Sequence, residues 1–253
     1  MLTLKELIEN QKNNQKIWLE RIYTTDNGVY HYSGNFHTYH LQLGIYNMSK
    51  SEFSLVKQNF SICALVDEFR VIEFNNRFFD YGLHHISYAI LSDNEPLIQR
   101  YAMLRYQRGV NAELSMDEMV ESGDIPIWCN TVQFFMANDN AGVERNLNII
   151  ETKTLKKLPK RELGLIDDYE FYKALLASDK KKMEEILEKL TSPKIHKQRN
   201  DSVILNKFIS LPALGYAKLA WRKGIEVEVK SKLVPKELLP IVPNEHYDIP
   251  YDF

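Results

Sequence analysis

Apolar residues recur at three- and four-residue steps along most of the chain, which is the spacing of one face of an α-helix. The first such stretch predicts a helix over residues 3–23, with apolar positions Leu4, Leu7, Ile8, Trp18, Leu19 and Ile22. A turn at 24–28 separates it from a second predicted helix around 36–46. A third predicted helix runs to residue 72, and Ser49 or Ser51 can cap its start.

Two segments have the pattern of antiparallel helices joined by a short turn. In the first, helices over 86–91 and 93–104 meet at Asp93, whose carboxylate we expect to accept hydrogen bonds from the next helix. The pattern returns at 172–190 around Asp179. Equivalent positions share apolar character: Ile86/Tyr172, Leu97/Met183, Tyr101/Leu187 and Leu104/Leu190. Two similar hairpins separated by 86 residues indicate that one hairpin pattern occurs a second time, and not that the chain is a repeat array.

The segment between these hairpins predicts three further helices. Ser115 and Glu118 have the spacing of a capping box, in which each side chain bonds the other residue's backbone N–H group. Pro126 opens a helix that ends at Asn138, and residues 142–158 predict another. The helical pattern therefore continues through the middle of the chain.

The C-terminal part changes character. Residues 202–223 have a helical pattern that contains Pro212, where we expect a kink or the meeting of two shorter helices. Residues 225–229 alternate with period two, but no comparable strand can pair with them, so we interpret them as an extended arm. Residues 235–253 contain four prolines and should lie across the helices.

Together these patterns predict an all-α fold. We expect a single domain over residues 1–253, built of stacked antiparallel helical hairpins with an extended, proline-rich C-terminal tail. If the chain divides at all, the division should fall near 153–161. The composition agrees, because the chain has only 10 glycines in 253 residues, and sheets and phosphate-binding loops both consume glycine.

The overall charge and hydropathy exclude two classes of partner. The formal net charge of −2 argues against a surface built to bind nucleic acid, which needs a basic excess. No window approaches the ~18 apolar residues of a membrane span, and the N-terminus has no signal-peptide pattern. We therefore expect a cytoplasmic chain that contacts neither nucleic acid directly nor a membrane.

Familiar catalytic motifs are absent from the sequence. It contains no glycine-rich phosphate loop, no Cys-x-x-Cys, no paired metalloprotease histidines and no nucleophile elbow. His37 and His40 could share a helical face, but the sequence supplies no further metal ligands beside them. His84 and His85 are adjacent and cannot face one ligand together on a helix. We therefore expect no catalytic residues, no metal and no cofactor.

Two other candidate groups have ordinary interpretations. The carboxylate pairs 167–168 and 184–185 could suggest acid–base chemistry, but on solvated helices such pairs are common surface. Cys63 and Cys129 lie in apolar helical contexts and are expected to be small buried apolar side chains.

Charge is segregated along the chain. Residues 109–144 contain no Lys or Arg and carry a charge of −7, whereas residues 145–161 carry +5. A solvated acidic face is one explanation. The other is a docking patch for a basic partner, because opposite potentials steer association and fix its register. The candidate partner-binding residues are Glu113, Asp117, Glu118, Glu121, Asp124 and Asp139.

Three C-terminal segments resemble a known family. Residues 211–229 (LPALGYAKLAWRKGIEVEV), 233–240 (LVPKELLP) and 247–253 (YDIPYDF) resemble the immunity protein 49 family of bacterial polymorphic-toxin systems. The opening helix and the hairpin around Asp93 are compatible with it. The resemblance implies an all-helical cytoplasmic protein that binds and neutralises a cognate toxin and so protects the producing cell. It implies neither the toxin's activity nor its contact residues.

The resemblance and the charge pattern give one main hypothesis. Immunity proteins that bind nucleases are often acidic, because they cover a site built for phosphates. We interpret 109–144 as part of a face that binds a toxin, for example a basic nuclease-type domain. Two alternatives stay open: a helical enzyme that uses His84 or His85 with a nearby acid, and a helical scaffold in another pathway. Whether the acidic residues form one patch depends on the packing of the predicted helices.

Overall fold

The all-α prediction is confirmed. The computed structural model describes residues 3–81, 83–109, 111, 113–200 and 205–251. Its helices are α1 (Leu4–Thr24), α2 (Gly28–Ser49), α3 (Phe53–Phe74), α4 (Leu83–Ser92), α5 (Glu95–Met103), α6 (Met116–Ser122), α7 (Ile127–Met136), α8 (Asn140–Ile149), α9 (Leu155–Lys157), α10 (Ile166–Leu176), α11 (Lys180–Thr191), α12 (Pro193–Arg199) and α13 (Leu211–Arg222). The strands β1 (Gln107–Arg108) and β2 (Leu114–Ser115) pair as a short antiparallel ribbon. This ribbon was not predicted, because two residues per strand leave no periodicity to detect.

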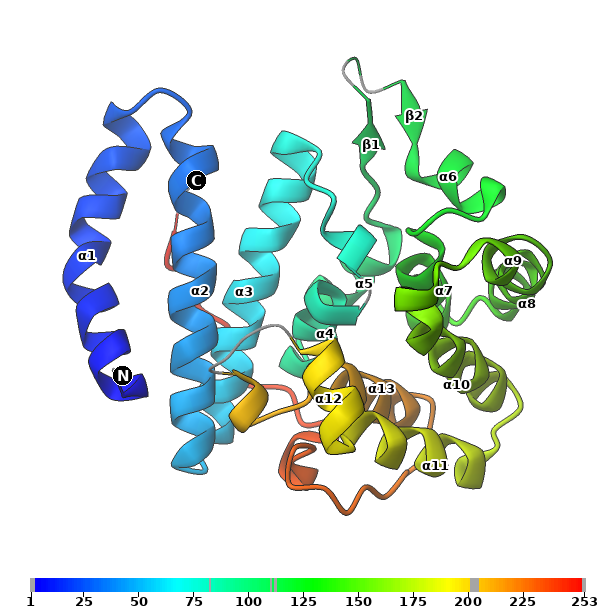
Figure 1. Cartoon of the computed structure of the whole chain (residues 1–253). Helices are drawn as coiled ribbons and strands as arrows, with labels where there is room; N and C mark the ends of the chain where they lie inside the picture. Colours follow the sequence, from blue (N-terminus) through cyan, green and yellow to red (C-terminus); the bar gives the residue numbers. More distant parts are fainter. Residues whose placement is uncertain (1–2, 82, 110, 112, 201–204, 252–253) are drawn as a thin grey trace.

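The three long N-terminal helices lie side by side, with α1 at the outer edge of the molecule and α3 packed on α4 (Figure 1). Thr3 and Glu6 form a capping box at the start of α1. α2 begins at Gly28, earlier than predicted, because Asn27 turns the chain with a φ of 54°. A Cβ on Gly28 would lie 2.3 Å from the carbonyl oxygen of Arg21, so this close turn requires glycine.

The start of α3 corrects one prediction. Its N-cap is Glu52, which makes no side-chain capping bond. Ser49 donates instead to the carbonyl oxygen of Tyr46 (2.6 Å). Ser51 adopts a φ of 60° in the turn. Neither serine caps α3, because Ser49 is the last residue of α2 and Ser51 lies one residue before the cap position.

The same type of helical hairpin occurs three times in the structure, whereas the sequence pattern predicted only two. In each turn, a residue with a φ of 56–57° precedes an Asn or Asp side chain that caps the next helix. The pairs are Asp93–Asn94, Asn138–Asp139 and Ser178–Asp179. Asn138 follows Asp93 by 45 residues and precedes Ser178 by 40, which are spacings typical of helical repeats. The middle hairpin escaped detection because polar residues occupy much of the first turns of α8.

Asp93 has a different role from the predicted one. The cap of α5 is Asn94, and the carboxylate of Asp93 is completely buried. It lies 2.8 Å from Nζ of Lys57, 2.7 Å from Nζ of Lys218 and 3.5 Å from Nη1 of Arg222. Burial lowers the pKa of Lys218 to about 8, although Asp93 opposes that shift. We call these four residues the Asp93 cluster.

The Asp93 cluster also holds the C-terminal segment. Nζ of Lys218 donates to the carbonyl oxygen of Leu238 (3.0 Å), and Nζ of Lys57 donates to that of Val242 (2.6 Å). The backbone N–H of Val242 donates to the carboxylate of Asp93 (3.2 Å). A single buried charge group therefore connects α3, the α4–α5 turn, α13 and the chain after α13.

A second anchor lies near the end of the chain. Nε2 of His40 is 2.7 Å from the hydroxyl oxygen of Tyr251, and Nδ1 is 2.8 Å from Oδ1 of Asn59. Because Asn59 Oδ1 can only accept, Nδ1 carries the proton and Nε2 accepts from Tyr251. Burial lowers the pKa of His40 to about 4, so the ring is neutral at pH 7.

Pro212 does not kink a helix. It lies in the first turn of α13, where a missing N–H group costs nothing. Part of the predicted 202–223 helix, residues 201–204, lies outside the described residues, and Leu205–Lys207 forms a 3₁₀ turn. Within the described chain, residues 225–229 belong to no helix or strand. α12, which begins at Pro193, was missed.

Most buried apolar residues form one cluster that extends from Leu41 to Leu239 and includes residues before and after 153–161. Cys63 and Cys129 are buried, as predicted. Among the described helices, none combines the length and the apolar character needed to cross a membrane.

The Asp93 cluster predicts a large effect for Asp93→Asn. Asn keeps the side-chain shape and tolerates a positive φ. The substitution leaves three cations without their buried counter-charge. We therefore expect the free energy of unfolding, measured by urea denaturation at pH 7, to fall by about 3 kcal/mol or more. Asp179→Asn is the control, because Asn caps a helix as well as Asp does. A loss below about 1 kcal/mol for Asp93→Asn would contradict a central role for this cluster.

His40 predicts a defined acid sensitivity. Its pKa is about 4 in the folded chain and 6.5 when unperturbed, so the unfolded state binds more protons between these values. Stability is therefore lost as the pH falls below 6.5. Between pH 8 and 5 this group should cost about 2 kcal/mol in total, because the loss approaches about 1.4 kcal/mol per pH unit only below pH 6.5. Urea unfolding of His40→Gln should lack this component, whereas the exposed control His246→Gln should retain it. Equal pH dependence in both variants would refute the assignment.

Candidate functional site

The six predicted acidic residues are all exposed, but they do not form one compact patch. Asp117, Glu118 and Glu121 lie on α6, and Asp124 follows that helix directly. Asp139 lies at the far end of α7, whose ten residues span about 15 Å. The structure therefore places four of the candidates together around α6 and separates Asp139 from them.

Three of the acidic side chains have structural partners. Asp117 accepts a hydrogen bond from Nε of Arg105 (2.9 Å). Glu118 completes the capping box with Ser115, and the hydrogen bonds from Ser115 lower the pKa of Glu118. The carboxylate of Asp139 caps α8. These contacts explain why acids occupy these positions without any reference to a partner.

The remaining three acids are less engaged. Glu113 accepts from the backbone N–H of Asn111 (2.9 Å) in the loop between the strands. Asp124 accepts from the hydroxyl of Ser122 (3.1 Å). The carboxylate of Glu121 has no hydrogen bond or ion pair within the part of the chain described here. Glu113, Glu121 and Asp124 are therefore the candidates best able to meet a partner.

The basic segment that follows the acidic one returns to it in space. Nζ of Lys153 donates to the carbonyl oxygen of Glu121 (2.6 Å), and Nζ of Lys157 lies 3.5 Å from that of Ser122. These lysines satisfy carbonyl groups at the C-terminal end of α6, where the helix dipole favours cations. Part of the charge segregation along the chain is thus compensated within the fold.

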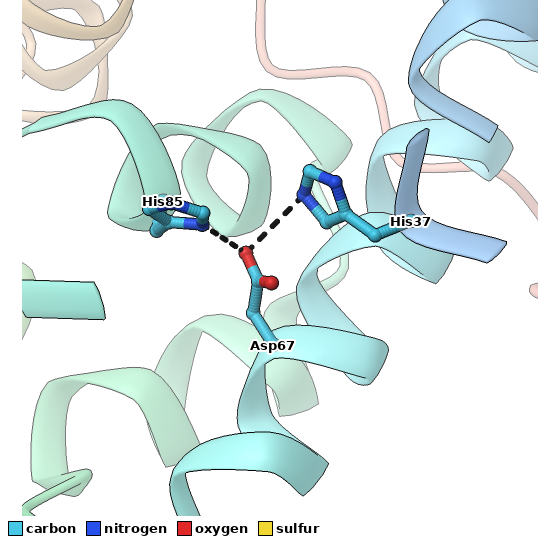
Figure 2. A group of neighbouring side chains, drawn as sticks. All are labelled: His37, Asp67 and His85. Atoms are coloured by element: carbon cyan, nitrogen blue, oxygen red, sulfur yellow. Dashed lines mark hydrogen bonds and ion pairs between the residues drawn. The ribbon is translucent and has the colours of Figure 1, made fainter. Parts of the chain in front are cut away.

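A second group of polar side chains lies between three helices (Figure 2). His37 from α2, Asp67 from α3 and His85 from α4 converge on one carboxylate oxygen. Oδ2 of Asp67 lies 2.5 Å from Nδ1 of His85 and 3.3 Å from Nε2 of His37. The side chain of Asp67 is 2% exposed, whereas those of His37 and His85 are 12% and 19% exposed. We call these residues the His–Asp–His cluster.

Aromatic rings fix the orientation of the two imidazoles. The ring of Phe78 stacks on His85 with centroids 4.1 Å apart. Tyr88 presents its ring at a steep angle to both histidines, with centroids 5.0 Å from His37 and 6.0 Å from His85. The imidazoles therefore have little freedom to rotate away from Asp67.

The carboxylate of Asp67 is held in its ionised form. Burial alone would raise its pKa, but the two neighbouring imidazoles outweigh burial and bring the pKa below its ordinary value. A carboxylate beside two imidazoles can hold protons or a metal ion.

These three residues were only partly predicted from the sequence. His37 was considered with His40, but the two rings point to different partners: His40 bonds Asn59 and Tyr251, and His37 faces Asp67. His85 meets an acid, as the enzyme alternative required, and the side chain of His84 lies outside what the structure describes. The missed signal was Asp67 itself, an acid within a long apolar run.

One carboxylate pair also differs from its prediction. Asp168, expected at the surface, is buried and lies 2.7 Å from Nη1 of Arg199. The hydroxyl of Tyr216 donates to the same carboxylate. Arg199 supplies the charge that allows an acid on the inner face of α10. Glu185 of the other pair is exposed, as predicted.

The sequence matches the model of a known protein family. The model of the family described as immunity protein 49 matches residues 39–238, which include most of the helices in Figure 1. The chain therefore belongs to the immunity protein 49 family, and the resemblance drawn from the sequence is confirmed. The matched range contains Asp67, His85 and Asp93, and it begins just after His37. No curated protein and no solved structure matches the chain.

Proposed function

We propose that this chain is an immunity protein that binds a cognate toxin in the cytoplasm of the producing cell and neutralises it without catalysis of its own. Membership of the immunity protein 49 family carries this proposal. The chain binds the toxin through a surface of complementary shape and charge, as in other inhibitory protein complexes.

The acidic surface around α6 is the proposed contact face. Glu113, Glu121 and Asp124 are exposed and have few internal partners, so they can meet cationic side chains of a basic toxin domain. Arg105 and Lys153 border this surface and limit its net charge. A mixed border of this kind favours a defined orientation of the partner, because misplaced like charges repel.

The enzyme alternative has less support. A groove of about 210 Å³ lies between α3 and the C-terminal segment, and its lining is mainly apolar. Its lining includes Ile62, Val66, Phe69, Ile72, Ile249 and Tyr251. None of the three residues of the His–Asp–His cluster lines it, so this groove offers no substrate site for a histidine–carboxylate mechanism.

Neutralisation is testable by co-expression. The toxin domain encoded next to this gene should arrest growth when produced alone, and the full chain should restore growth and co-purify with that domain. The Asp93→Asn variant serves as a folding-dependent control, because destabilisation lowers the amount of binding-competent protein. Continued growth arrest in the presence of abundant, folded chain, with no isolable complex, would refute the proposal.

The contact face predicts an effect of charge reversal. Glu113→Lys, Glu121→Lys and Asp124→Lys together should weaken toxin binding at least about tenfold at low salt and flatten its salt dependence. Asp117 and Glu118 are left unchanged, because their reversal would break the ion pair with Arg105 and the capping box.

The matched control changes the same amount of charge elsewhere. Glu9→Lys, Glu20→Lys and Glu73→Lys alter exposed acids on α1 and α3. Binding is measured by calorimetry at two salt concentrations, and folding is checked by circular dichroism. Equal losses in the two triple variants would show that net charge, not this face, governs binding.

A further inference from the structure

The His–Asp–His cluster brings together the ligand types that transition metals prefer. One ligand atom from each of His37, Asp67 and His85 lies within 4.8 Å of the other two. Neutral imidazole and carboxylate suit Zn²⁺ and its neighbours in the first transition row, whereas Mg²⁺ and Ca²⁺ prefer oxygen ligands alone. Two histidines and one carboxylate, with the fourth position open, also form the ligand set of many protein zinc sites.

The distances are compatible with such an ion. Zinc holds nitrogen and oxygen at about 2.0–2.2 Å, so neighbouring ligand atoms of a tetrahedron lie about 3.3–3.5 Å apart. Nε2 of His37 lies 3.3 Å from Oδ2 of Asp67, which is already that separation. Nδ1 of His85 lies 2.5 Å from the same oxygen and would have to withdraw by about 0.8 Å to reach it.

Two atoms of the cluster are incompletely satisfied without an ion. Nε2 of His37 is buried and lacks a hydrogen bond of good geometry, even though Oδ2 of Asp67 is near. Oδ1 of Asp67 is also buried and accepts no hydrogen bond from the described residues. For His37 and Oδ2 of Asp67, two atoms that face a shared metal rather than each other produce this combination of short distance and poor alignment. Nδ1 of His85 hydrogen-bonds Oδ2 of Asp67 (2.5 Å), and binding of the ion would replace the proton of that bond.

We propose that His37, Asp67 and His85 form a Zn²⁺ site that joins α2, α3 and α4. The partial exposure of both imidazoles leaves a route to solvent, so a water molecule completes the coordination. The stacked ring of Phe78 holds His85 in position for the ion. The ion cross-links three helices that contact one another in sequence order, and the site does not depend on toxin binding.

The test uses the full chain after treatment with a chelator. Zn²⁺ added alone should bind one ion per chain in calorimetry, and Mg²⁺ should not. At a Zn²⁺ concentration about 100 times Kd, Tm should rise by about 5–10 °C. Co²⁺ in place of Zn²⁺ should give the visible absorption of a four-coordinate site.

Variants locate the ion. His37→Gln, Asp67→Asn and His85→Gln keep the approximate side-chain size and should each weaken Zn²⁺ binding at least about 100-fold. The exposed histidines supply controls, and His31→Gln and His246→Gln should leave Kd unchanged. Zinc binding that survives in the cluster variants, or no saturable binding by the unmodified chain, would overturn the proposal.

A measurement on the unmodified chain tests the same ligands even if the variants fail to fold. X-ray absorption of the zinc-loaded protein should show two imidazole nitrogens, oxygen ligands and no sulfur. The sulfur criterion matters because Cys63 lies one helical turn before Asp67 and its thiol hydrogen-bonds the backbone carbonyl of His37. A spectrum with sulfur in the first coordination sphere, or with oxygen alone, would assign the ion to another site.

Discussion

The buried carboxylate of Asp93 is the interaction on which the arrangement of the molecule depends. One anion at a helical turn receives Lys57 from α3 and both Lys218 and Arg222 from α13. The lysines also satisfy backbone carbonyls of the C-terminal segment. Removal of one partner from such a group leaves charges buried without compensation, which costs far more than the loss of a surface ion pair. The position of α13 against α3 and α4 therefore depends on this charge balance.

The same principle divides the acidic residues of the chain into two kinds. Asp93, Asp67 and Asp168 are buried beside cations or imidazoles and hold helices together. The acids around α6 are exposed, and among them Glu121 and Asp124 make few contacts within the described fold, whereas Asp117 pairs with Arg105 and Glu118 caps the helix. The chain thus uses its buried acids to maintain the fold, and the proposed contact face is drawn from its exposed acids.

The candidate sites could be predicted from the sequence only in part. The acidic face could be found as a run without Lys or Arg, because its members on α6 are close in sequence. The His–Asp–His cluster could not, because His37, Asp67 and His85 come from three helices and meet only through packing. Spacing along a chain identifies ligands on one helix face, but it carries no information about convergence between helices.

The sequence by itself determined the helical class, the capping box at Ser115, and the family, because these depend on local periodicity and short motifs. Only the tertiary structure decided the roles of Asp93 and Asp168. An acid next to a helix start has the same local pattern whether it caps that helix or neutralises a distant lysine. The choice depends on which cations the packed helices bring to it, and Lys218 is 125 residues away along the chain.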